Sequence, residues 1–190
     1  MNTKEITEKI SDYKTTEKKL HYLNGLENKI GIVKPETRQA FYQKLGDLSV
    51  ESNRLLDAES YYKKGNIADK EAWKKLGMTY LSKRGELEEA ERVFKMGKFS
   101  DKQANATIGD YLFEGAREAA MNYPLMYSLS DGAADECEER KRMFLREAMQ
   151  YYAKAGLKEK VELVSEILQN PSHYGSFEPV KKKKIGGDEK

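Results

Sequence analysis

One short pattern recurs four times in this chain and constrains its fold more than any other feature. A turn-forming residue opens each copy and a small or slim residue closes it five positions later, in NRLLDA, GELEEA, GAREAA and GLKEKV. The opening residues are of types that end a helix in the left-handed conformation, namely Asn53, Gly85, Gly115 and Gly156. The closing residues leave room for a second helix to cross closely, namely Ala58, Ala90, Ala120 and Val161. The pattern therefore predicts one helical hairpin, repeated four times.

The remaining periodicity indicates an all-α chain. Apolar residues recur at intervals of three and four rather than two, and only four prolines occur. We expect a first helix near 3–24 and then pairs of helices near 36–50 and 54–65, 70–83 and 86–97, 102–113 and 116–129, and 134–155 and 158–169. The chain then divides into an N-terminal helix and linker at 1–34, a helical repeat array at 35–170 and a flexible basic tail at 171–190.

The second hairpin resembles a tetratricopeptide repeat. In AWKKLGMTYLSKRGELEEAERVF the residues on that family's pattern are Trp73, Leu76, Gly77, Tyr80, Ala90 and Phe94. Partial matches elsewhere are Leu45, Gly46, Ala58 and Tyr62, then Ile108, Gly109 and Ala120, then Phe144, Ala148, Tyr151, Gly156 and Val161. The chain departs from the family by one extra residue before Ala90 and by lacking a proline after each second helix. The resemblance covers about 36–169 and implies an α-solenoid of antiparallel hairpins, a right-handed superhelix.

This resemblance also implies which residues are buried and how the chain functions. Burial is expected at Trp73, Leu76, Tyr80, Ala90, Phe94, Phe144, Tyr151 and Val161. Arrays of this family typically lay a peptide or a partner helix along the concave surface made by the first helix of each pair. The chain is therefore interpreted as a non-enzymatic protein–protein interaction scaffold. The residues expected to line its groove are Gln43, Asp47, Lys74, Met78, Asp110, Leu145 and Met149.

The expected groove predicts something about its ligand. The family's best-known groove clamps a terminal carboxylate with paired Lys and Asn, whereas here Lys74 is followed one turn later by Met78. Asp47 and Asp110 add negative charge. An acidic C-terminal peptide is therefore not the expected ligand. A helix or an extended segment with apolar anchors and some basic character fits better, since methionine gives adaptable apolar contact.

Composition and motifs argue against other classes. The 34 basic and 32 acidic residues give a net charge of +2, too little for a strong long-range field. His21 and His173 have no partner at metal-ligand spacing, and no catalytic constellation is visible, so no enzyme activity, metal or cofactor is predicted. A single cysteine, Cys137, cannot form an internal disulfide, which suits a reducing compartment or a protein that needs no disulfide. Neither a secretory signal nor a membrane-spanning stretch is found, so a cytoplasmic location is expected.

A nucleic-acid-associated accessory protein remains the alternative interpretation. The tandem tyrosines at 61–62 and 151–152 could stack on bases, and the four lysines at 181–184 could contact phosphates or act as a nuclear address. Tyr62 and Tyr151 are more simply core positions, with Tyr61 and Tyr152 at helix edges or on the groove. A steep salt dependence of binding would separate this alternative from a protein scaffold.

Overall fold

A computed structural model describes residues 3–30, 34–129 and 131–169, and all of its regular structure is helical, with no strand in those ranges. The predicted all-α class is thereby confirmed. The chain separates into two compact units, Met1–Ala104 and Asn105–Lys190, and each is described by itself. The basic tail at 171–190 lies outside the described residues, and its predicted flexibility stays a prediction.

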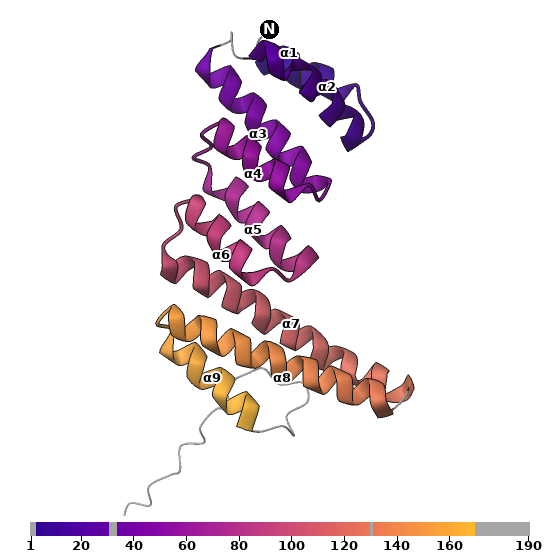
Figure 1. Cartoon of the computed structure of the whole chain (residues 1–190). Helices are drawn as coiled ribbons and strands as arrows, with labels where there is room; N and C mark the ends of the chain where they lie inside the picture. Colours follow the sequence, from indigo (N-terminus) through magenta and orange to yellow (C-terminus); the bar gives the residue numbers. More distant parts are fainter. Residues whose placement is uncertain (1–2, 31–33, 130, 170–190) are drawn as a thin grey trace, which may run out of the picture. The chain divides into compact units, whose positions relative to one another are not determined.

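Helical hairpins make up the first unit. Its helices are α1 (Thr3–Ser11), α2 (Thr16–Ile30), α3 (Pro35–Glu51), α4 (Leu55–Lys64), α5 (Lys70–Arg84) and α6 (Leu87–Met96), followed by the first residues of α7 (Asp101–Leu129) (Figure 1). The second unit holds the rest of α7, then α8 (Asp131–Lys154) and α9 (Lys158–Gln169). Helices α3 and α4 pack together, as do α5 and α6, and α8 and α9. These bounds agree with the predicted ones except at two places.

The first difference lies at the N-terminus, where one continuous helix was predicted. The chain instead breaks after Ser11, and α2 begins at Thr16. The hydroxyl of Thr15 accepts a hydrogen bond from the amide of Lys18 at 3.4 Å, which satisfies one of the free donors at the start of α2. The resulting hairpin forms a core with α3 from Ile6, Ile10, Leu20, Leu23, Phe41, Leu45 and Leu48. Apolar spacing alone did not reveal this break, because both helices place their apolar side chains in the same core.

The first two predicted turns are confirmed. Asn53 and Gly85 have φ values of 56° and 64°, which is the left-handed conformation that ends a helix. The amide of Arg54 donates to the carbonyl of Ser49 at 2.8 Å and so closes the first turn. The closing residues of these two copies, Ala58 and Ala90, are fully buried where the helices cross.

Left-handed residues also end α4, α6 and α8. They are Asn66, Lys98 and Gly156, with φ values of 48°, 60° and 71°. In each case the amide of the next residue donates to the carbonyl of an aromatic residue, and the pairs are Ile67 to Tyr62 at 3.0 Å, Phe99 to Phe94 at 3.1 Å and Leu157 to Tyr152 at 2.9 Å. Gly156 lies between α8 and α9, which pack against each other, so the predicted turn of the fourth hairpin is confirmed.

The second difference is at Gly115, where the predicted turn does not exist. Helix α7 continues through this glycine, which packs against the ring of Phe144 in α8, so a tertiary contact covers it. Figure 1 shows α7 and α8 running side by side. The third hairpin is therefore α7 with α8, and the parts of these helices nearest to residue 130 form an extension that the first two hairpins lack.

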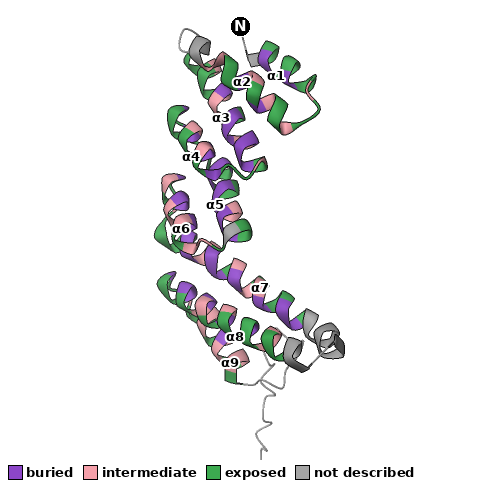
Figure 2. Ribbon diagram, turned by 45° about the vertical axis from the view of Figure 1, so that its right-hand side comes forward, coloured by how far each residue is buried: buried purple, intermediate pink, exposed green. Residues whose placement is uncertain are grey.

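Most of the expected burial is confirmed. Trp73, Leu76, Tyr80, Ala90, Phe94 and Tyr151 are buried, and the indole of Trp73 donates to the carbonyl of Ile67 at 2.8 Å. Figure 2 shows buried and exposed positions alternating along the helices. Phe144 and Val161 are only half-buried, contrary to expectation. Phe144 lies in the extension of the third hairpin, and Val161 lies on α9.

Candidate interaction surfaces

Two of the predicted groove residues in the first unit hold its helices together. The side-chain amide of Gln43 donates to Asp69 at 3.1 Å, and Asp69 in turn caps α5 by accepting from the amide of Glu71 at 2.9 Å. The carboxylate of Asp47 accepts a hydrogen bond from the hydroxyl of Tyr62 at 2.7 Å. The other two predicted residues are more available to a partner, because Lys74 is exposed and Met78 is half-buried.

The predicted residues of the second unit are similarly engaged. Asp110 accepts from the hydroxyl of Tyr152 at 2.9 Å and forms an ion pair with Lys160 of α9. Leu145 is buried and does not reach the surface, whereas Met149 is half-buried. Of the three groove residues predicted in this unit, Met149 is therefore the one that is partly exposed and has no charged partner among the described contacts.

The two aspartates share a structural reason that the sequence interpretation missed. Each follows a glycine that faces an aromatic ring, in Gly46-Asp47 opposite Tyr62 and in Gly109-Asp110 opposite Tyr152. In the second hairpin the equivalent glycine is Gly77, its ring is Phe94 and the next residue is Met78. A carboxylate thus occurs where the ring carries a hydroxyl, and a methionine occurs where it does not.

The electrostatic effect on these tyrosines is consistent with that assignment. The pKa of Tyr62 is raised well above its ordinary value, first by burial and second by the hydrogen bond to the carboxylate of Asp47. The same two causes, in the same order, raise the pKa of Tyr152. The aspartates are therefore packing partners of the tyrosines rather than free charges on a groove.

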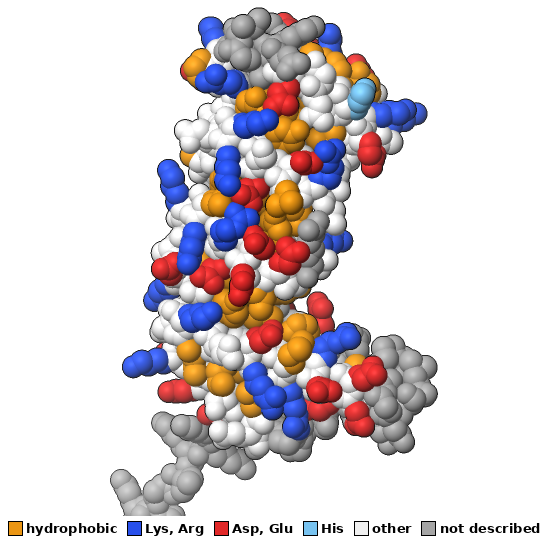
Figure 3. All heavy atoms as spheres, in the orientation of Figure 1, with side chains coloured by type: hydrophobic (Ala, Val, Ile, Leu, Met, Phe, Trp, Pro, Cys, Tyr) orange, Lys and Arg blue, Asp and Glu red, His pale blue; other side chains and the backbone are white. Residues whose placement is uncertain are grey.

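An ion pair between a half-buried arginine and a buried glutamate links the second helices of the first two hairpins. Arg92 of α6 holds both carboxylate oxygens of Glu59 in α4, at 2.9 and 2.6 Å, and also contacts Glu89 at 2.7 Å. The hydrogen bond from Arg92 is the largest cause that lowers the pKa of Glu59. On the face shown in Figure 3, basic and acidic side chains are interleaved. This arrangement supports the weak net field expected from the composition.

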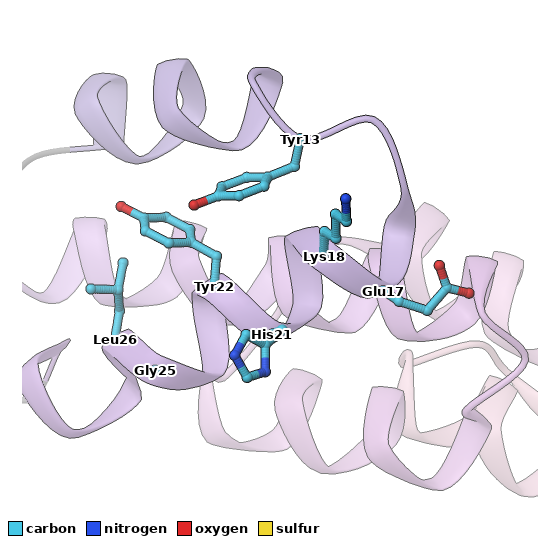
Figure 4. A pocket seen from close by; sticks show the side chains of 7 residues that line it. All are labelled: Tyr13, Glu17, Lys18, His21, Tyr22, Gly25 and Leu26. Carbon is cyan, nitrogen blue, oxygen red and sulfur yellow. The ribbon is translucent and has the colours of Figure 1, made fainter.

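An apolar cleft on the N-terminal hairpin is the most site-like feature, and the sequence interpretation missed it. It has a volume of about 560 Å³ and is lined by Tyr13, Glu17, Lys18, His21, Tyr22, Gly25 and Leu26. Figure 4 shows Tyr13, from the connection between α1 and α2, lying over Tyr22 of α2. Their ring centroids are 5.3 Å apart and the ring planes are tilted by 34°.

The cleft exists because α2 uses its other side for the core. Leu20 and Leu23 are buried against α3, which leaves Tyr22 and Leu26 half-buried at the edge of that core. Glu17, Lys18 and His21 are exposed on the rim. In Figure 4 the charged pair Glu17 and Lys18 lies toward one end of the cleft, and Leu26 and Gly25 lie toward the other. No sequence signal identified the cleft, because it depends on the break between α1 and α2.

The lining of the cleft is mainly apolar. Its lining combines aromatic and aliphatic surface with a few charged side chains on the rim, a composition typical of ligand and partner sites. Over the described ranges no group of three or more His, Cys, Asp or Glu residues is arranged to hold a metal ion. His21 lines the rim of the cleft.

The tandem tyrosines offer little stacking surface. Tyr62 and Tyr151 are buried, as expected, but Tyr152 is also buried, so its predicted place at a helix edge or on the groove is wrong. Tyr61 is half-buried, stacks on Tyr42 with centroids 6.4 Å apart, and donates its hydroxyl hydrogen to Asn24 at 3.1 Å. The rings of Tyr62, Tyr151 and Tyr152 are therefore not available for base stacking in this structure.

Comparisons with protein-family models, with curated proteins and with solved structures found no match to this chain. Within the described part of the chain, no helix combines the length and the apolar character that crossing a membrane requires.

Proposed function

We propose that this chain is a non-enzymatic interaction module that binds a segment of a partner protein. The observation that carries this proposal is the apolar cleft between Tyr13, Tyr22 and Leu26, which no side chain of the described residues fills. A volume of about 560 Å³ accommodates several side chains of a partner. Exposed apolar concavities of this kind mark interaction sites, because leaving them in contact with water is unfavourable.

The repeated hairpins support a scaffold as the framework for this site. Their shared turns and glycine contacts favour a stacked array of the tetratricopeptide type, an α-solenoid in which neighbouring hairpins cover one another's apolar faces. A concave groove on the first helices remains part of the proposal. Its testable residues are Lys74 and Met78, since Asp47 and Asp110 are engaged with tyrosines.

The experiment is a quantitative pull-down with the full chain and three variants. Gly25→Leu fills the cleft, Lys74→Glu with Met78→Glu changes the groove, and Leu56→Ser changes an apolar side chain on α4 that is 70% exposed. We expect at least one protein to be lost with Gly25→Leu and kept with Leu56→Ser. A folded Gly25→Leu chain that keeps every captured protein would rule out the cleft as the binding site.

A further inference from the structure

The chain follows a consistent rule at glycines inside helices. At three of them, the position a side chain would occupy is taken by an aromatic ring from another helix, and the pairs are Gly46 with Tyr62, Gly77 with Phe94 and Gly109 with Tyr152. At a fourth, Gly115, the ring of Phe144 lies close to that position, at 3.2 Å. A methyl group added at Gly77 would lie 2.6 Å from the Phe94 ring, and one added at Gly109 would lie 2.7 Å from the Tyr152 ring. Each of these glycines is a socket that lets a ring approach the helix backbone closely.

Gly25 departs from this rule. It lies inside α2, between Tyr22 and Leu26, and a methyl group added there would meet no heavy atom within 4 Å. A glycine inside a helix is unfavourable compared with alanine, because it increases the conformational freedom lost on folding. Nothing in the described chain compensates for that cost at Gly25. Gly25 is exposed and lines the cleft beside Tyr22 and Leu26, so the equivalent socket is open to a side chain from outside (Figure 4).

The charges around the cleft restrict the occupant further. Glu17 and Lys18 are exposed, carry opposite charges, and lie about two helical turns before Gly25. This end of the cleft is thus complementary to a neighbouring basic and acidic pair, and it favours neither a phosphate backbone nor an anionic membrane surface. A helix can present such a pair about two turns away from a single aromatic residue.

We propose that the Gly25 socket receives an aromatic side chain from a helix of a partner protein. That helix carries a basic and an acidic residue about two turns from the aromatic, opposite Glu17 and Lys18. The proposal rests on the interaction function proposed above and specifies the chemistry of the partner. It extends to an outside ring the packing that the chain itself uses at Gly46, Gly77 and Gly109.

The test uses the full chain and a fluorescent, alanine-based helical peptide as the probe. The peptide carries one guest position and, two turns away, one Lys and one Glu. We expect Phe or Trp at the guest position to bind at least about tenfold more tightly than Ala. The same peptides should bind at least about tenfold more weakly to Gly25→Leu, and amide NMR shifts should centre on Tyr22, Gly25 and Leu26.

Each other outcome overturns a stated part of the proposal. Equal binding of Leu and Phe guests would overturn the preference for an aromatic ring, and unchanged binding to Gly25→Leu would overturn the socket. Vesicles of phosphatidylcholine and phosphatidylserine form a second arm, since binding that Gly25→Leu abolishes would assign the cleft to a membrane instead. If Gly25→Leu does not fold, Gly25→Ala replaces it, because its methyl group meets no neighbour.

The two proposals fail in different ways. Peptide binding without any cleft-dependent cellular partner would leave the socket standing and refute the proposed function. A cellular partner that needs the cleft but binds without an aromatic anchor would refute the aromatic socket and leave the proposed function standing.

Discussion

The pairing of Asp47 with Tyr62 predicts a specific pattern of coupled stability changes. In the second hairpin the equivalent positions are Met78 and Phe94, so the two combinations found in this chain are Asp with Tyr and Met with Phe. Changing Asp47→Met together with Tyr62→Phe converts the first combination into the second. Each single change instead leaves one polar group without its partner.

The magnitudes follow from the burial of the two groups. Asp47→Met leaves the hydroxyl of the buried Tyr62 without an acceptor, and an orphaned buried donor costs roughly 1–3 kcal/mol of unfolding free energy. Tyr62→Phe leaves the half-buried carboxylate of Asp47, which water can still reach, so we expect a loss of roughly 0.5–1.5 kcal/mol. The double variant has neither orphan and should lose no more than Tyr62→Phe alone.

Urea unfolding followed by circular dichroism measures all four proteins of this cycle. For a chain of this size, each 1 kcal/mol corresponds to a change in melting temperature of about 2–4 °C. The coupling between the two positions should be about 1 kcal/mol or more. If the losses of the single variants simply add in the double variant, the hydrogen bond does not explain why aspartate and tyrosine occur together.

Three further predictions concern stability. Gly25→Ala should raise the unfolding free energy by about 0.5–1 kcal/mol, because it replaces a helical glycine that no side chain covers. Gly77→Ala should instead lower it, because the new methyl group would clash with Phe94. Thermal melts of both variants check these two changes. The pKa of Glu59 is lowered in the folded chain, so its contribution is complete above the ordinary value of 4.5 and is lost as pH falls; Glu59→Gln should flatten that acid loss in pH-dependent melts. The raised pKa values of Tyr62 and Tyr152 imply stability that is complete below their ordinary value of 10 and declines as pH rises above it, and Tyr62→Phe should reduce the decline seen in alkaline urea titrations.

The sequence predicted most of the helices, because their ends carry local signals. Asn53 and Gly85 end helices through backbone conformations that their residue types favour, and neighbouring residues suffice to recognise them. Gly115 gives the same local signal, yet α7 continues through it. The ring of Phe144, which is distant in sequence, packs against this glycine, and neighbouring residues do not reveal that contact. Gly156 gives the same local signal and does end α8, in the left-handed conformation, before α9 packs back against it.

A longer-range signal was present but not used. The glycine of a first helix and its aromatic partner are separated by 16 residues in Gly46 and Tyr62, and by 43 residues in Gly109 and Tyr152. Recognising that pairing would have shown the longer third hairpin directly. The cleft could not have been found in this way, because its walls meet only after the chain breaks between Ser11 and Thr16.

The most direct test of the interaction function is site-specific photo-crosslinking in cells. A photo-reactive amino acid replaces the exposed His21 on the rim of the cleft in one protein and the exposed Leu56 of α4 in the control. The account predicts a discrete crosslinked protein from position 21 that is absent from position 56 and disappears when Gly25→Leu is added. The same crosslinked products from both positions, or products from position 21 that persist with Gly25→Leu, would contradict it.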